Sequence, residues 1–117
     1  MGLTFVDCKV KGENGQEHDV RLLVDSGATY TLLAKEHWKA IELSPKRKMD
    51  FTLADGSIIK RNISECYIRL PQGEGHTPVI LGEEGDESLL GAVTLEIIGL
   101  KLNPFNRTLE PLKMMLA

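Results

Sequence analysis

Residues 21–33 read RLLVDSGATYTLL, which places a carboxylate, a hydroxyl and a glycine between two apolar stretches. Burying an unpaired carboxylate is costly, so Asp25 requires either a partner or a chemical purpose. Taken alone, the Asp-Ser-Gly tripeptide favours a simple turn at the end of a strand. In that interpretation Asp25 caps the next segment and Gly27 supplies an unusual φ angle. The rest of the chain decides whether this interpretation is sufficient.

The composition is that of an ordinary globular protein. Of its 117 residues, 42% are hydrophobic and 26% are charged, which predicts one domain over residues 1–117 with a modest core. The net charge of -3 and a pI near 5.6 argue against nucleic acid as the main partner. No apolar run approaches the ~20 residues of a membrane span, and the N-terminus lacks a signal-peptide pattern. We therefore expect a cytoplasmic protein, or alternatively a soluble domain of a larger protein.

The side chains that commonly bind metals are scattered along the chain. The three histidines lie far from one another, and no cysteine, histidine or carboxylate spacing matches a known metal motif, so no metal or cofactor is predicted. Cys8 and Cys66 are isolated, and in a reducing compartment we expect them to be small buried side chains. The sequence leaves a disulfide between them open.

Short β segments separated by turn signals dominate the pattern. A first hairpin is predicted to turn at Asn14-Gly15, because this pair supports the positive φ angles of a type I′ turn. A second hairpin is predicted to turn at Asp55-Gly56, between alternating apolar residues. The strands are expected over residues 3–10, 19–24, 49–53, 59–63, 66–70 and 79–81.

Two short helices interrupt the β pattern. Apolar residues at helical spacing predict one helix over residues 34–42, ended by Pro45, and a second over residues 90–98, ended by Gly99. The last residues, 107–117, fit either a strand or a frayed helix. The fold class is therefore all-β, with one or two short helices.

Three segments in order resemble the retropepsin-like aspartic proteases, especially their small single-domain bacterial members. They are VDSGATYTLL (24–33), a hairpin tipped by LADGS (53–57), and SLLGAVTLEIIGL (88–100). The resemblance implies a closed-barrel-like acid-protease fold with a flap hairpin, and an aspartic endopeptidase acting on peptides or proteins without a cofactor. Such hydrolysis takes two carboxyls sharing one proton. Because this chain has one such motif, the resemblance also implies a homodimer.

The resemblance implies roles for individual residues. Asp25 would be the catalytic carboxylate, and Ser26 would lock the two symmetry-related loops together through its hydroxyl. Gly27 and Ala28 would keep the site open to substrate. The remaining supporting residues that it implies are Asp55 and Gly56 at the flap tip, and Leu90 and Gly91 packed with Leu89 beneath the Asp25 loop.

The sequence departs from the retroviral pattern in several places. Thr29 and Ala92 stand where retroviral enzymes often have an acid and an arginine, so that ion pair is missing, and the flap tip is not glycine-rich. The loop GEEGDES (82–88) carries four acids. It either lies against the cleft and favours cationic peptide side chains, or points into solvent where salt screens it.

Two other functions remain open. A domain of the same fold could bind peptides or mediate dimerisation without catalysis, since fold does not fix function. A structural β domain in which Asp25 only satisfies a turn is the second alternative. The intact Asp25-Ser26-Gly27 favours the protease, because a binding module has no need of an acid at that point.

Overall fold

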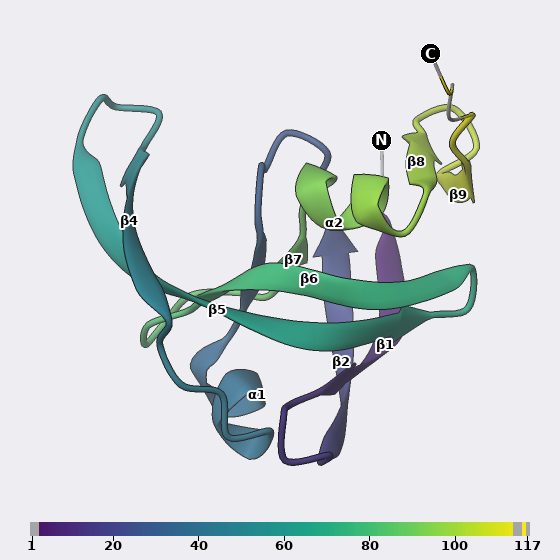
Figure 1. The fold of residues 1–117 in the computed structure, drawn as a ribbon. Helices are drawn as coiled ribbons and strands as arrows, with labels where there is room; N and C mark the ends of the chain where they lie inside the picture. Colours follow the sequence, from purple (N-terminus) through teal and green to yellow (C-terminus); the bar gives the residue numbers. More distant parts are fainter. Residues whose placement is uncertain (1–2, 114–115, 117) are drawn as a thin grey trace.

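The computed structural model describes residues 3–113 and residue 116, and most of its elements are β-strands (Figure 1). In chain order the elements are β1 (Phe5–Lys11), β2 (Glu17–Val24), β3 (Thr31–Leu33), α1 (Lys35–Ala40), β4 (Arg47–Thr52), β5 (Ile58–Leu70), β6 (Gly73–Leu81), β7 (Leu89–Leu90), α2 (Ala92–Ile97), β8 (Leu100–Asn103) and β9 (Thr108–Pro111).

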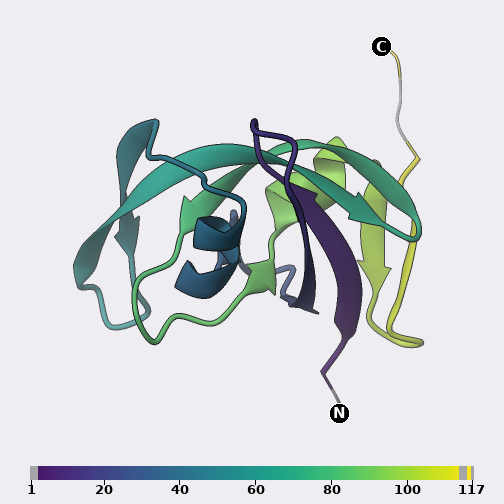
Figure 2. The same cartoon turned by 90° about the horizontal axis from the view of Figure 1, so that it is seen from below.

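The main sheet curls until it closes on itself. Its strand order is β1-β2-β7-β3-β6-β5-β4, and β1 also pairs with β5, so β4 alone stands outside the ring. Figure 2 shows the curved strands wrapping around the interior, with α1 and α2 beside them. β8 and β9 form a separate two-stranded sheet. The predicted barrel-like, all-β fold class is therefore confirmed.

The core lies inside this ring, and strand alternation supplies it. Successive side chains of a strand point to opposite faces, so alternate residues of β1, of β2 and of β5 from Ser64 onward face inward. Val10, Leu22 and Ile68 are fully buried in this way. Cys8 and Cys66 are buried, as expected from the sequence, and both are free thiols. Burial raises the pKa of each thiol to about 12.

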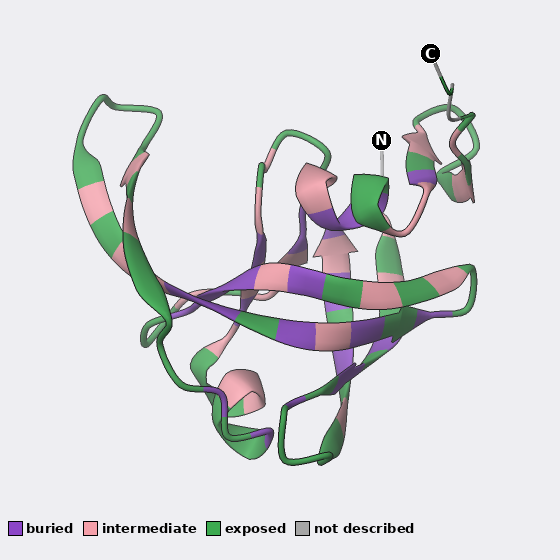
Figure 3. Ribbon diagram, viewed as in Figure 1, coloured by how far each residue is buried: buried purple, intermediate pink, exposed green. Residues whose placement is uncertain are grey.

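The hairpin formed by β4 and the first residues of β5 projects from the ring as an arm. None of its residues from 47 to 62 is buried, and Figure 3 shows only exposed and intermediate colours along it. Few apolar contacts anchor such a segment, so its opening costs less free energy than opening the ring. Among the described residues, no helix is long and apolar enough to cross a membrane.

The first hairpin turn differs from the predicted type I′ turn. Gly15 has a φ of +83°, whereas Asn14 does not adopt a positive φ. The Asn14 side-chain oxygen instead accepts the Gln16 N–H at 3.0 Å, and the Gly15 N–H donates to the Gly12 carbonyl at 3.0 Å. The turn is therefore closed by the side chain of Asn14 and not by its backbone, and the loop spans residues 12–16.

The long hairpin that follows is more continuous than predicted. The strands expected over 59–63 and 66–70 are one strand, β5, because Ser64 and Glu65 between them pair with β6 and no glycine or proline interrupts the run. The helices are shorter than expected, and Leu90 belongs to β7. At the C-terminus, Thr108–Pro111 is a strand, and residues 114, 115 and 117 lie outside the described part.

Candidate active site

The Asp25 loop, residues 25–30, begins where β2 ends. β2 runs parallel to β7, and the Asp25 N–H continues this pairing by donating to the Leu90 carbonyl at 3.0 Å. The Ala28 N–H donates to the Asp25 carbonyl at 3.1 Å and closes a tight turn. The main chain of Asp25 is thereby fixed between β7 and its own turn.

The carboxylate of Asp25 is half-buried and nearly unpartnered. One of its oxygens accepts the Gly27 N–H at 3.0 Å. Among residues 3–113 and 116 it has no other hydrogen bond and no ion pair. The hydroxyl of Ser26 is exposed and also makes no hydrogen bond within this described part of the chain. Both groups are therefore available to bind other molecules.

The start of α2 supports the Asp25 loop from beneath. The Ala92 N–H donates to the Ala28 carbonyl at 2.8 Å, and the Val93 N–H donates to the Thr29 carbonyl at 2.9 Å. Gly91 permits this approach, since a Cβ at this position would lie 2.5 Å from the carbonyl carbon of Tyr30. The structure thus brings Leu90 and Gly91 against the loop that carries Asp25.

A buried chain of threonine hydroxyls lies below these contacts. Thr31 Oγ1 accepts the Gly91 N–H at 3.0 Å and lies 2.5 Å from Thr94 Oγ1, which lies 2.7 Å from Thr77 Oγ1. The chain connects β3, α2 and β6, and its three side chains are 0–2% exposed. Sequence analysis did not identify these residues. The available signal was a threonine next to apolar residues in each of three segments, which is too common to select them.

A cavity of about 390 Å³ lies between the Asp25 loop and the projecting hairpin. Gly27 and Ala28 contribute to its wall beside the carboxylate. Its apolar lining comes from the loop, the barrel and the hairpin: Tyr30, Leu32, Phe51, Leu53, Ile59 and Leu89. The rings of Tyr30 and Phe51 meet edge to face with centroids 6.1 Å apart, which joins the loop to β4. The cavity suits an apolar side chain.

The tip of the hairpin is not brought into this cavity. Asp55 Oδ1 accepts the backbone N–H and the hydroxyl of Ser57, at 2.9 and 2.6 Å, and these bonds lower the pKa of Asp55. Gly56 completes the turn with a φ of +87°. In Figures 1 and 2 the tip stands apart from the loop between β2 and β3. The structure therefore describes an open arrangement, in which neither tip residue lines the cavity.

The acidic loop GEEGDES is partly neutralised by one arginine of the hairpin. Arg61 Nη1 lies 2.9 Å from a Glu83 carboxylate oxygen, and Arg61 Nε lies 3.3 Å from an Asp86 oxygen. Asp86 lines the cavity, whereas Glu84 and Glu87 are exposed. The loop therefore reaches the cavity at Asp86 and solvent at Glu84 and Glu87, and the preference for cationic peptide side chains stays a prediction.

Comparison with known proteins adds a family and a fold. Residues 8–96 match the family described as "gag-polyprotein putative aspartyl protease". Among solved structures, EIAV protease complexed with the inhibitor HBY-793 is similar with a TM-score of 0.65, over 87% of this chain and 93% of that chain, at 17% sequence identity. At this identity the structural similarity concerns the fold. None of the curated proteins matches the sequence.

Proposed function

The chain belongs to the retropepsin-like aspartyl protease family, and from this premise we propose that it hydrolyses peptide bonds between the Asp25 carboxylates of two copies. One observation carries the proposal. The backbone of Asp25 is fixed by β7, yet its carboxylate is half-exposed and accepts a single hydrogen bond, from Gly27. A carboxylate whose backbone is fixed but whose oxygens accept only one hydrogen bond within the chain fits a site that a second copy completes.

The proposed chemistry needs only the two carboxyls and a water molecule. Held close together they share one proton, because two adjacent negative charges repel. The ionised carboxylate removes a proton from water as it attacks the scissile carbonyl carbon, while the protonated carboxyl donates a hydrogen bond to the carbonyl oxygen. A proton then passes to the leaving amine as the carbon–nitrogen bond breaks.

The remaining loop residues position this pair in the proposal. Exposed Ser26 donates its hydroxyl across the twofold axis to the partner subunit's loop. Gly27 and Ala28 present a low wall to the substrate backbone, and the apolar cavity beside them receives an apolar side chain next to the scissile bond. Leu90 and Gly91 act indirectly, by holding the loop through backbone contacts.

The hairpin serves as the lid in this proposal. Closure of the arm brings Asp55 and Gly56 over a bound peptide and excludes water from the reacting carbonyl. The arm is suited to this movement because residues 47–62 contain no buried side chain. The tight Ser57–Asp55 turn keeps the tip ordered while the arm moves as a unit.

The test of catalysis is an exchange of one carboxyl for an amide. A diverse peptide mixture is incubated with wild type, with Asp25→Asn, and with Asp7→Asn as a matched control, because Asp7 lies on the exposed face of β1. We expect Asp25→Asn to lose about 10³-fold or more of the rate while Asp7→Asn retains it. Retained hydrolysis in Asp25→Asn refutes the assignment. Peptide binding by wild type without hydrolysis at any pH identifies a noncatalytic module instead.

The shared site is tested by mixing subunits. Wild type and Asp25→Asn are unfolded together in equal amounts and refolded, so that subunits combine at random. If only dimers with two intact carboxyls are active, activity falls to about a quarter of that of wild type at the same total concentration. If each monomer is active on its own, the mixture retains about half of the wild-type activity. The second result, in a sample that sediments as a monomer, excludes the two-copy site.

A further inference from the structure

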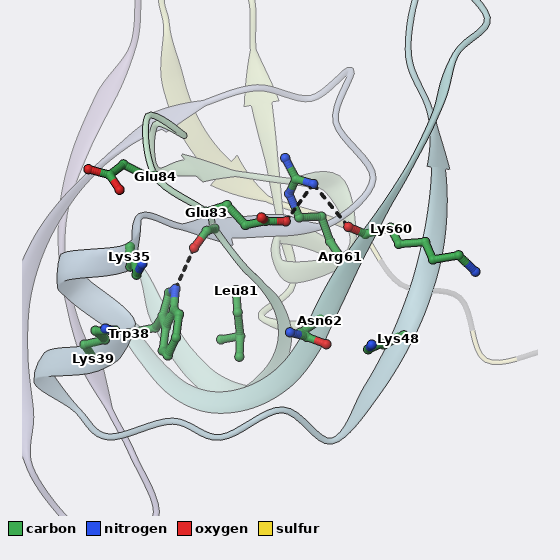
Figure 4. A pocket seen from close by; sticks show the side chains of 11 residues that line it. Lys35, Trp38, Lys39, Lys48, Lys60, Arg61, Asn62, Leu81, Glu83 and Glu84 are labelled. Atoms are coloured by element: carbon green, nitrogen blue, oxygen red, sulfur yellow. Dashed lines mark hydrogen bonds and ion pairs between the residues drawn. The ribbon is translucent and has the colours of Figure 1, made fainter.

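A second, larger cavity of about 610 Å³ lies between α1 and the base of the projecting hairpin, and it is not part of the site described above. Figure 4 shows it from close by. Its lining includes Lys35, Trp38 and Lys39 from α1, Lys48 from β4, Asn62 from β5 and Leu81 from β6. We call this cavity the lysine groove.

The hairpin separates the lysine groove from the cleft beside Asp25. Lys48 is the cross-strand partner of Asn62, and both line the groove. Phe51 and its cross-strand partner Ile59 line the cleft. Because alternate residues of a strand face opposite sides, the arm presents one face to each cavity. Arg61 lines both cavities, so they meet at this side chain.

The groove carries unpaired positive charge on a chain whose net charge is -3. Among residues 3–113 and 116, the ammonium groups of Lys35, Lys39 and Lys48 form no ion pair. Of the two carboxylates in the lining, Glu83 is paired with Arg61, which leaves Glu84. The three cations come from two separate elements that converge on one cavity, which distinguishes them from scattered surface lysines.

The floor of the groove is fixed and partly apolar. The indole N–H of Trp38 donates to the Gly82 carbonyl at 2.9 Å, which sets the orientation of the ring (Figure 4). Lys39 Nζ lies 6.0 Å from the centroid of that ring. Leu81 adds apolar surface, and Asn62 adds an amide that can donate and accept. Aromatic and amide surface between cations suits a peptide backbone with acidic side chains.

We propose that the lysine groove binds an acidic segment of a polypeptide. Charge complementarity selects carboxylate-bearing chains, since three lysines without an ion pair among the described residues line the cavity. Nucleic acid fits less well, because the chain is acidic overall and Glu84 faces the same cavity.

The groove also extends the cleft, a step that rests on the proposed function. A polypeptide whose scissile bond lies beside Asp25 can continue past Arg61, because this residue borders both cavities. Acidic residues several positions from the scissile bond then reach the lysines. The groove would thus select substrates by an acidic segment of the substrate that lies away from the catalytic carboxylates.

Binding is tested without relying on catalysis. Fluorescein-labelled hexaglutamate is titrated against the full Asp25→Asn chain and followed by anisotropy. Unlabelled hexaglutamate should also change the emission of Trp38, the only tryptophan, which locates the binding in the groove. The triple change Lys35→Gln, Lys39→Gln and Lys48→Gln should weaken binding about tenfold. The equally charged control Lys11→Gln, Lys101→Gln and Lys113→Gln should change it less than about twofold.

Three results overturn the binding proposal. They are an absence of hexaglutamate binding at low salt, equal losses in the two triple variants, and tighter binding of hexathymidylate than of hexaglutamate. The last result would assign the groove to nucleic acid. Raising the ionic strength from about 0.05 to about 0.3 M should weaken specific binding, because it shortens the screening length.

Cleavage then tests the link to the proposed function. Two peptides share one scissile segment and differ by a distal run of glutamate or glutamine. Wild type should cleave the glutamate peptide with the higher kcat/KM, and the groove triple variant should lose this preference. Equal cleavage by wild type overturns the substrate role. If no peptide is cleaved while hexaglutamate still binds, the proposed function fails and the groove remains a binding site.

Discussion

Replacing Gly91 by alanine should destabilise the protein through backbone overlap alone. The new Cβ would lie 2.5 and 2.6 Å from the carbonyl carbon and oxygen of Tyr30 and 2.9 Å from the carbonyl oxygen of Thr29. All three are main-chain atoms, so no side chain can rotate to relieve the contact. Gly91 has φ -97° and ψ 173°, which alanine adopts readily, so the conformational cost is small.

The magnitude follows from what must move. Relief requires the Asp25 loop to shift away from α2, which weakens the Val93–Thr29 and Ala92–Ala28 hydrogen bonds. Each of the two hydrogen bonds contributes about 1 kcal/mol, and overpacking costs about 1–3 kcal/mol, so we expect a loss of about 3–5 kcal/mol in the free energy of unfolding. Urea unfolding followed by the fluorescence of Trp38 measures it.

The matched control is Gly56→Ala, in which the strain would come from the backbone conformation and not from contact with other atoms. Gly56 has a φ of +87°, and a Cβ at this position would have no other atom within 4 Å, so its cost is conformational and about 1 kcal/mol. Gly91→Ala should also reduce peptide hydrolysis, since the loop that carries Asp25 moves. If Gly91→Ala lowers the free energy of unfolding no more than Gly56→Ala does, the argument from backbone contact is refuted.

Two further changes test the interior and the surface. The Ser64 hydroxyl is buried without a hydrogen-bond partner among the described residues. Ser64→Ala should therefore raise the free energy of unfolding by about 1 kcal/mol, measured by urea unfolding. A clear loss of stability contradicts this. Burial lowers the pKa of His37 from 6.5, outweighing the raising effect of Glu36, and nearby His18 lowers it further. The unfolded chain therefore binds the proton more readily, and stability should fall as pH drops through 6.5 towards the folded pKa. His37→Gln should flatten the pH dependence of the urea midpoint over this range, and an unchanged slope contradicts the assignment.

The sequence predicted the elements that carry local signals. Asp-Gly at residues 55–56 marked a hairpin turn, and the alternating apolar residues of β1 and β2 marked strands with one buried face. The approach of Leu90 to the Asp25 loop followed only from the family resemblance, because local pattern cannot state which strands become neighbours across 65 residues of chain.

The features that sequence analysis missed depend on long-range packing. Ser64 and Glu65 resemble an interruption between two strands, but β6 pairs with both and makes β5 continuous. The lysine groove combines Lys35 and Lys48, which lie on a helix and a strand that no periodicity connects. Such sites exist only once the barrel has closed, so tertiary contacts rather than local propensity determine them.

The threonine chain beneath the Asp25 loop has a fixed direction. Thr77 Oγ1 lies 3.2 Å from the Pro78 carbonyl, which can only accept, so the single hydroxyl proton of Thr77 points there. Thr94 must then donate to Thr77, and Thr31 to Thr94, which leaves Thr31 to accept the Gly91 N–H. Each hydroxyl proton in the chain between Gly91 and Pro78 is therefore directed to a single acceptor. A valine at Thr94 would leave the hydroxyl proton of Thr31 without its acceptor and remove the donor to Thr77, whereas serine would preserve the sequence of donors.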